Sequence, residues 1–322
     1  MSKTTIQKRQ APDEIPFYKE LISGCRDDYN TLRTAIVHPV AAHVIEGALT
    51  CRKENLLEPV LVGPEERIKK AAEDGEFDIS DLEVIATEHS HEAAHKSVEL
   101  ARKGKVDALM KGHIHTDEML GFVTSKDGGL RTGRRMSHVF VIDIPEDKYP
   151  KPLWLSDAAL NIQPSLRQKR DIVQNAIDLF TACGFGTPKV AILSATEKIT
   201  EDVPSTVEAA ALCKMADRKD ITGGLLDGPL AVDNAISEEA AKTKGITSDV
   251  AGDVDILIAP DLDSGNMLYK QMKYLSGYNA AGLVMGARVP VILTSRAAET
   301  QTRLASAALA VRYLNCKEVD KP

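Results

Sequence analysis

Two apolar runs in the last quarter of the chain lead into polar residues that could bind an anion. The run 254–260 is followed by the polar stretch 261–266, and the run 289–293 leads to Ser295 and Arg296. Each run has the composition of a short buried strand, and ligands in open α/β sheets bind outside the carboxyl ends of strands. A serine hydroxyl and an arginine guanidinium beside backbone N–H groups suit an oxyanion such as phosphate.

A helix is predicted between these two strands. Gly265 and Asn266 open it, apolar residues recur at helical spacing from 267 to 275, and Gly277 stands where the helix would end. The polar stretch after the first strand therefore lies at the start of a helix.

Arginine is concentrated in a separate segment, 130–138. Arg131, Arg134 and Arg135 lie within five residues and have glycines on both sides. A run of charge is usually a solvated face, but guanidinium groups also match phosphate oxygens with paired hydrogen bonds. Because the chain has a net charge of −7, this basic segment is a strong candidate for an anion cradle.

Histidines occur in two patterns that could bind a metal. His91 and His95 fit the HExxH spacing of zinc proteases, but no convincing third ligand follows, and we interpret the segment as the start of an amphipathic helix. His113 and His115 alternate after the predicted strand 106–112, where they could form a metal site, a polar rim or a loop with one structural histidine. We expect no bound metal.

Two glycine-containing segments need separate interpretation. The segment 184–186 resembles part of a dinucleotide-binding fingerprint, but it follows a helix and precedes a strand, which is the wrong order. We therefore expect a turn that ends a helix. The segment 223–235 places Asp227 and Asp233 on a turn, which is either a simple capped turn or part of a binding site.

Strand and helix alternate along the chain, which predicts an α/β fold with a mainly parallel sheet. The predicted strands are 34–37, 59–64, 83–86, 106–112, 139–144, 153–157, 190–194, 222–230, 254–260 and 289–293. The length of 322 residues suggests about two domains. The charged, proline-rich stretch 145–152 is the best candidate for the crossover between them.

Composition excludes several classes of function. The chain has 40 basic and 47 acidic residues, so no basic surplus favours nucleic acid, and 4% aromatic content disfavours a platform for stacking bases. No apolar run approaches the ~20 residues of a membrane span. The five scattered cysteines and the polar N-terminus predict a cytoplasmic protein with reduced thiols.

Several motifs together resemble the phosphate acetyltransferase/phosphate butyryltransferase family. That family carries a PxLxxGNxxxK element, which is matched by Pro260 to Lys270, and a Ser-Arg pair after a later strand, which is matched by Ser295-Arg296. The segment 228–235 fits a GxLxxDxA element, and 111–116 fits a Gly-x-x-His-Thr element. The resemblance covers about residues 30 to 312 and is strongest in the second half.

The resemblance implies an enzyme that moves an acetyl or butyryl group between coenzyme A and inorganic phosphate. It implies two α/β domains with a cleft between them, in the architecture of isocitrate and isopropylmalate dehydrogenases. We assign residues 1–148 and 289–322 to the first domain and 149–288 to the second. Coenzyme A is expected as a substrate, with no tightly bound cofactor, and the protein is expected to be a homodimer.

The resemblance also assigns roles by matching position. Ser295 would contact the sulfur or the oxyanion, and Arg296 and Arg131 would bind phosphate. The other expected contacts to phosphate or acyl phosphate are Arg134, Arg135, His115, Thr116, Ser264 and Asn266. The expected contacts to coenzyme A or the cleft are Asp233, Asp261 and Lys270.

One position departs from the family pattern. Acetyltransferases place an aspartate six residues after the arginine as a proposed base, and this chain has Thr302 there. Glu299 is the alternative base, and the departure favours the butyryltransferase branch. The sequence fixes neither the acyl chain length nor the physiological direction.

Two other functions stay open. A metal- and NAD-dependent decarboxylating dehydrogenase of the same architecture could use His113, His115, Asp261 and Asp263. A non-catalytic protein that binds coenzyme A or acyl phosphate is supported by Thr302 alone. Turnover of NAD without coenzyme A would indicate the dehydrogenase, and coenzyme A binding without thiol release would indicate the non-catalytic protein.

Overall fold

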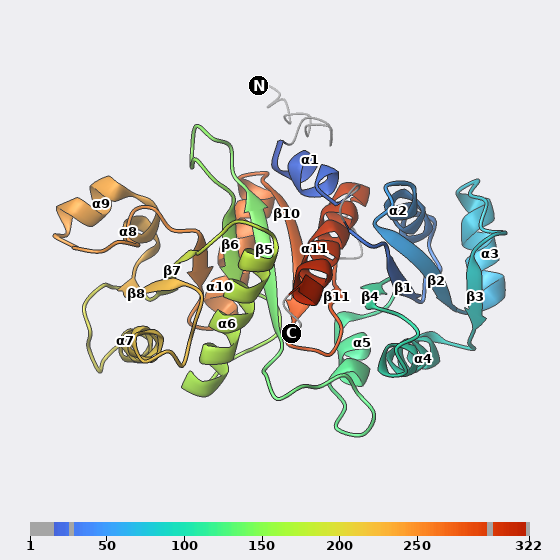
Figure 1. Cartoon of the computed structure of the whole chain (residues 1–322), viewed down its shortest axis with the longest axis horizontal. Helices are drawn as coiled ribbons and strands as arrows, with labels where there is room; N and C mark the ends of the chain where they lie inside the picture. The colour runs from blue at the N-terminus through green and yellow to red at the C-terminus, as the bar shows by residue number, and fades with distance from the viewer. Residues whose placement is uncertain (1–15, 26–28, 295–298, 320–322) are drawn as a thin grey trace, which may run out of the picture.

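Strand and helix alternate through the computed structural model, which describes residues 16–25, 29–294 and 299–319. The first half contains α1 (Pro16–Ser23), β1 (Leu32–Val37), α2 (Ala42–Lys53), β2 (Leu57–Gly63), α3 (Glu65–Asp74), β3 (Glu83–Ala86), α4 (Ser90–Arg102), β4 (Ala108–Lys111), α5 (Thr116–Val123) and β5 (Ser137–Asp143). The second half contains β6 (Leu153–Ser156), α6 (Leu166–Ala182), β7 (Lys189–Leu193), α7 (Pro204–Asp217), β8 (Leu225–Leu230), α8 (Val232–Ile236), α9 (Glu238–Thr243), β9 (Ile256–Ile258), α10 (Leu262–Lys270), the π-helix η2 (Gln271–Leu275), β10 (Asn279–Met285), β11 (Val291–Ile292) and α11 (Thr300–Val319). Figure 1 shows their arrangement.

The strands of the described residues form one sheet in the order β3-β2-β1-β4-β11-β10-β5-β6-β9-β7-β8. Most neighbours are parallel, and the antiparallel pairs are β11 with β10, β10 with β5, and β5 with β6. Helices pack on both faces of this sheet. The predicted α/β fold with a mainly parallel sheet is therefore confirmed. Within the described ranges, no helix has the length and apolar character needed to cross a membrane.

The sequence-based prediction omits β10, and this strand decides how the two C-terminal runs are oriented. Its sequence of mostly small residues contains a single β-branched side chain, which is a weak strand signal. The antiparallel pairs reverse the sheet between β11 and β6, so β9 and β11 run in opposite directions. Strand direction alone therefore does not bring the ends of these two runs to one edge of the sheet.

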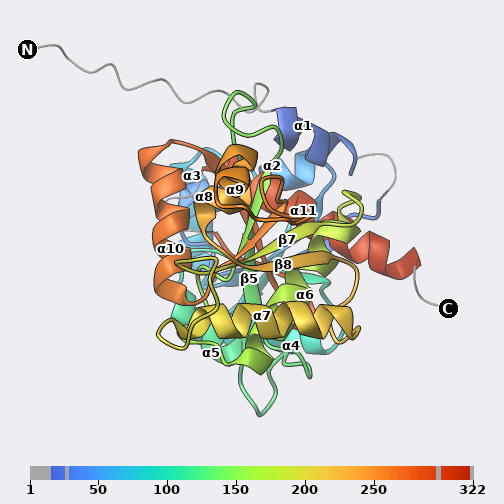
Figure 2. The same ribbon diagram turned by 90° about the vertical axis from the view of Figure 1, so that its left-hand side faces the viewer.

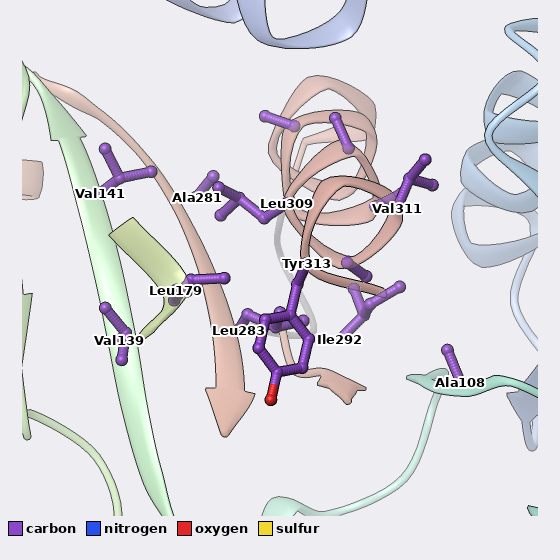
Figure 3. Close-up of a cluster of buried hydrophobic side chains, with 14 of the residues drawn as sticks. Ala108, Val139, Val141, Leu179, Ala281, Leu283, Ile292, Leu309, Val311 and Tyr313 are labelled. Carbon is purple, nitrogen blue, oxygen red and sulfur yellow. The ribbon is translucent and has the colours of Figure 1, made fainter. Parts of the chain in front are cut away.

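The C-terminal helix α11 connects the two halves through the hydrophobic core. One continuous cluster of buried side chains lines a whole face of the sheet, and α11 packs there against α2, β10, β11 and α6. Figure 3 shows α11 side chains meeting those of the central strands, with Val139, Val141, Ala281, Leu283, Ile292, Leu309 and Tyr313 among the labelled residues. The other face carries two separate clusters, one under α4 and α5 and one under α8 and α10.

The predicted crossover segment lies within the continuous sheet. It connects β5 to β6, which are antiparallel neighbours. β11 pairs with β4 and α11 packs on α2, so the last elements of the chain lie against its first half. The division into residues 1–148 with 289–322 and residues 149–288 stays a prediction.

Candidate active site

A buried carboxylate organises the turn that follows β6. Asp157 is 3% exposed, and its Oδ1 accepts hydrogen bonds from the backbone N–H groups of His138 (3.3 Å), Ala159 (3.0 Å) and Leu160 (3.2 Å). Its Oδ2 accepts from the N–H of Asn161 at 3.0 Å. Burial raises the pKa of the Asp157 carboxyl, while these hydrogen bonds lower it. The carboxylate thus fixes both the turn and the start of β5.

Asn161 connects this turn to the arginine-rich segment. Its Nδ2 donates to the backbone oxygen of Met136 at 2.8 Å and also to the Asp157 carboxylate. Its Oδ1 accepts a hydrogen bond from Arg135 Nε. The Arg135 side chain is therefore held by the turn after β6.

The start of α10 packs against the same turn. Asn266 Nδ2 donates to the backbone oxygen of Ala158 at 2.8 Å. A Cβ atom added to Gly265 would lie 2.5 Å from the Asp157 backbone oxygen, so glycine permits this close approach. Asp261 caps the helix, since its Oδ1 accepts from the N–H of Ser264 at 2.9 Å and from its hydroxyl at 2.7 Å.

Helix α6 holds the segment 134–137 from the other side. Asp171 Oδ2 accepts from the N–H of Arg135 at 2.9 Å. Asn175 Nδ2 donates to the Arg135 backbone oxygen at 2.8 Å. The Arg134 guanidinium forms an ion pair with Asp178. Polar residues on successive turns of α6 thus fix the position of this segment.

The remaining arginine of the segment lies beside the hairpin that precedes β11. Arg131 forms an isolated antiparallel bridge with Ala287. The hydroxyl of Thr132 donates to the backbone oxygen of Gly286 at 2.6 Å, and the N–H of Arg288 donates to the backbone oxygen of Leu130 at 2.9 Å. The loop that carries Arg131 is therefore tied to the strand that leads to the Ser-Arg pair.

These elements enclose a pocket of about 750 Å³. Its lining residues come from α5, the 131–136 segment, the turn after β6 and the start of α6, and include Asp117, Thr124, Arg131, Arg134, Arg135, Asn161, Ser165, Arg167, Gln168 and Asp171. Figure 1 shows α5 and α6 on opposite sides of the chain segment that leads into β5. The pocket therefore combines residues from both predicted domains.

The arginines of the pocket differ in their partners. Arg134 pairs with Asp178, and Arg135 donates to Asn161. Arg131 and Arg167 have neither an ion pair nor a side-chain hydrogen bond with any other described residue. These two guanidinium groups are exposed and can accept an anionic ligand without breaking an existing contact.

Several predicted residues border the pocket without lining it. Asn266 contacts the turn whose next residues line it, and Ser264 and Asp261 form the cap of the same helix. His115 and Thr116 stand at the start of α5, directly before the lining residue Asp117. The sequence analysis did not predict the lining residues of the turn after β6 or those of α6. The available signal was Asp157 at the end of the predicted strand 153–157, with the polar residue Asn161 shortly after it.

Asp233 and Lys270 do not line this pocket. Asp233 forms an ion pair with Lys244 at 3.0 Å on the α8–α9 side of the second half. The hydrogen bond from Lys244 lowers the pKa of the Asp233 carboxyl. Lys270 is exposed at the end of α10. The structure therefore gives neither residue a contact with the pocket.

The C-terminal part of the predicted site is described incompletely. Ser295 and Arg296 lie outside the described residues. Thr294, directly before them, is buried at the end of the β11 segment. Glu299 and Thr302 are half-buried at the start of α11.

The HExxH segment and His38 make structural contacts in the described chain. The HExxH segment forms the first turns of α4, where Glu92 accepts a hydrogen bond from the N–H of Glu88 and His91 and His95 lie against Phe122. His38 Nδ1 bonds the backbone oxygen of His113 at 2.8 Å, and burial lowers the pKa of the His38 imidazole. Among the described residues, no three His, Cys, Asp or Glu side chains are grouped as metal ligands. The glycines of 184–186 form the turn after α6, as predicted.

Comparisons with known proteins agree on one family. The profile of the family described as phosphate acetyl/butaryl transferase matches residues 86–311. A phosphate acetyltransferase of Rhizobium meliloti is 51% identical over 302 residues, which are 94% of this chain and 95% of the relative. A phosphate butyryltransferase of Clostridium acetobutylicum is 42% identical over 267 residues, which are 83% of this chain and 88% of the relative.

Solved structures show the same fold. A branched-chain phosphotransacylase of Enterococcus faecalis has a TM-score of 0.74 at 27% identity and covers 88% of this chain and 99% of its own. A phosphotransacetylase of Streptococcus pyogenes has a TM-score of 0.78 at 22% identity, with 94% and 99% covered. A 4-hydroxythreonine-4-phosphate dehydrogenase of Burkholderia phymatum has a TM-score of 0.52 at 14% identity, with 88% and 98% covered, and its likeness is one of fold alone.

Replacement of Gly265 tests the contact between α10 and the turn after β6. Gly265→Ala places a methyl group 2.5 Å from a backbone oxygen, and we expect it to lower the free energy of unfolding by roughly 1–3 kcal/mol. The gain of up to about 1 kcal/mol from alanine in a helix is too small to offset this clash. The control Gly121→Ala in α5 meets no atom within 4 Å and should be neutral or stabilising. Equal denaturation midpoints for the two variants would contradict the packing.

Proposed function

The chain belongs to the phosphate acetyl/butyryltransferase family, and we propose that it catalyses reversible transfer of an acetyl group between coenzyme A and inorganic phosphate. The observation that supports this proposal most is the arginine-lined pocket. Two guanidinium groups there have no side-chain partner among the described residues, and Asn266 of one family motif contacts the turn that leads to the lining residues. An acidic chain that keeps cations free in a cleft favours an anionic substrate over other solutes.

The reaction needs an anion site next to a thioester. A phosphate oxygen attacks the carbonyl carbon, a C–O bond forms, and the C–S bond breaks with its electron pair leaving on sulfur. The products are an acyl phosphate and the coenzyme A thiolate, which then takes up a proton. Negative charge develops on the carbonyl oxygen, so cations and hydrogen-bond donors must surround it. Binding both substrates together supplies much of the rate enhancement.

We assign Arg131 to the reacting phosphate and give Arg134 and Arg135 a positioning role. The ion pair of Arg134 with Asp178 and the hydrogen bond of Arg135 with Asn161 support this division, because both groups already have partners. Ser295 and Arg296 would contact the oxyanion and the phosphate. The loop that carries Arg131 contacts the hairpin before β11, and this supports a position of Arg131 close to the strand that precedes Ser295 and Arg296.

His115 and Thr116 would add donors at the start of α5, and Ser264 and Asn266 would shape the cleft from the start of α10. The Asn266 amide is engaged with a backbone oxygen and the Ser264 hydroxyl with Asp261. These contacts favour a structural contribution from α10, whose residues do not line the pocket. Asp233 and Lys270 would contact at most a distant part of coenzyme A.

We propose acetyl as the transferred group. Thr302 at the usual aspartate position favours the butyryl branch, but it is one position. The identity of 51% with a phosphate acetyltransferase, against 42% with a phosphate butyryltransferase, extends over most of the chain. We also propose a cytoplasmic location, in which the five free cysteines would stay reduced.

An activity assay tests the proposed reaction. Release of coenzyme A thiol from acetyl-, propionyl- and butyryl-coenzyme A is followed with a thiol reagent, with and without phosphate. We expect phosphate-dependent release that is fastest with the acetyl substrate. Release that is independent of phosphate, or NAD turnover without any coenzyme A requirement, would contradict the proposal.

Glu299 is our proposed base for the coenzyme A thiol. Glu299→Gln should lower the rate of acyl-coenzyme A synthesis about 100-fold at pH 7. The loss should shrink as the pH rises through about 8.5, where a free thiol ionises by itself. Thr302→Asp in the Glu299→Gln background should restore part of the rate. Unchanged rates for Glu299→Gln at every pH would reject the assignment.

A homodimer through the second half is our proposal for the assembled state. Met267, Tyr274 and Leu275 are 68%, 64% and 83% exposed on α10 and η2, and Figure 2 shows α10 on the outside of the molecule. A cluster of large exposed apolar side chains is typical of an interface. Leu275→Asp should convert the dimer to a monomer in sedimentation velocity, while Val207→Asp on α7 should leave it intact. A monomeric wild-type protein would contradict the proposal.

A further inference from the structure

We infer that Arg167, together with the outer part of the pocket, binds the phosphate groups of the coenzyme A nucleotide. This inference rests on the proposed function and adds a residue that the sequence motifs do not include. It assigns the two free arginines of the pocket to different ends of the substrates. Arg131 serves the reacting phosphate, and Arg167 serves the remote, non-reacting phosphates.

Among the four arginines that line the pocket, Arg131 and Arg167 are the two without a side-chain partner in the described ranges. The neighbour of Arg167 on the helix, Arg170, donates to Asp171 Oδ1 at 2.6 Å. Arg134 and Arg135 are engaged with Asp178 and Asn161. Arg167 lines the pocket from the first turn of α6 and has no polar partner within the described ranges.

The acidic residues of the pocket do not neutralise Arg167. Asp171 is occupied by the Arg170 guanidinium and by the N–H of Arg135. The other lining carboxylate, Asp117, lies on α5 and forms no ion pair with a described residue. The lining thus carries four arginines against two aspartates, which leaves a local positive charge in a chain whose net charge is −7.

The size of the pocket favours a large ligand. Its volume of about 750 Å³ falls in the range of about 300–1,000 Å³ found for sites of sizeable organic ligands. A water molecule occupies about 30 Å³ of liquid, so one phosphate ion would fill a small fraction of the space. Coenzyme A carries a pyrophosphate and a ribose phosphate, and a pocket of this size can hold such a group.

Position separates the two possible sources of phosphate oxygens, because Arg131 and Arg167 are both exposed. The loop of Arg131 contacts the hairpin that precedes β11, through the bridge with Ala287 and the hydroxyl of Thr132. Arg167 lies on the first turn of α6 and lines the pocket from a different element. This position favours the nucleotide phosphates of coenzyme A for Arg167 and leaves inorganic phosphate to Arg131.

The test combines an arginine variant with a shortened substrate. Arg167→Ala should lower kcat/KM for acetyl-coenzyme A about tenfold, which is the loss of one charge-assisted contact. It should leave kcat/KM for S-acetylpantetheine, which lacks the nucleotide phosphates, unchanged. The KM for phosphate should also stay at the wild-type value. Arg218→Ala at the exposed C-terminal end of α7 controls for loss of one surface charge.

Two results would overturn the inference. Equal losses with both thioesters would mean that Arg167 acts elsewhere, and a raised KM for phosphate would assign it to inorganic phosphate. Direct calorimetric binding of coenzyme A and of pantetheine to wild type and Arg167→Ala separates this inference from the proposed reaction. If wild type binds coenzyme A more tightly than pantetheine through Arg167 but releases no thiol, the reaction is wrong and the binding site stands. If wild type binds both equally, the binding site is wrong.

Discussion

The buried carboxylate of Asp157 is the constraint on which the rest of the site depends. Burial disfavours its charged form and raises the pKa of the carboxyl, and the N–H groups of the turn offset part of this effect. The turn fixes Asn161, which holds Arg135, and it presents the backbone oxygen that Asn266 contacts. A buried carboxylate without these donors would cost several kcal/mol, so the turn and the start of β5 are held together.

This arrangement explains how the site can be cationic without being unstable. Arginines packed closely in an acidic protein repel one another unless acids or amides separate them. On α6, Asp171 accepts a hydrogen bond from the backbone N–H of Arg135, and Asp178 forms an ion pair with the side chain of Arg134. With that segment fixed, Arg131 and Arg167 can stay free for a ligand, and little reorganisation is needed on binding. Electrostatic preorganisation of this kind suits transfer of an acyl group to phosphate.

Much of the fold and part of the site could be predicted from the sequence, and there are physical reasons why the other features could not. The strand and helix alternation, the basic segment and the polar start of α10 follow from local patterns. β10 was missed because its small residues give a weak strand signal, and its antiparallel pairing reverses the directions of β9 and β11. The sequence could not show which arginines have a partner and which stay free, because the partners on α6 are about 40 residues away in the chain. Long-range pairing of charges leaves no local pattern.

The most direct measurement is a crystal structure of the protein with bound coenzyme A. We expect density for the ligand in the pocket between α5, the 131–136 segment and the start of α6, with its phosphates against Arg167 and its thiol end towards Arg131. An empty pocket, with coenzyme A bound at another surface, would show that the arginine-lined pocket is not the active site.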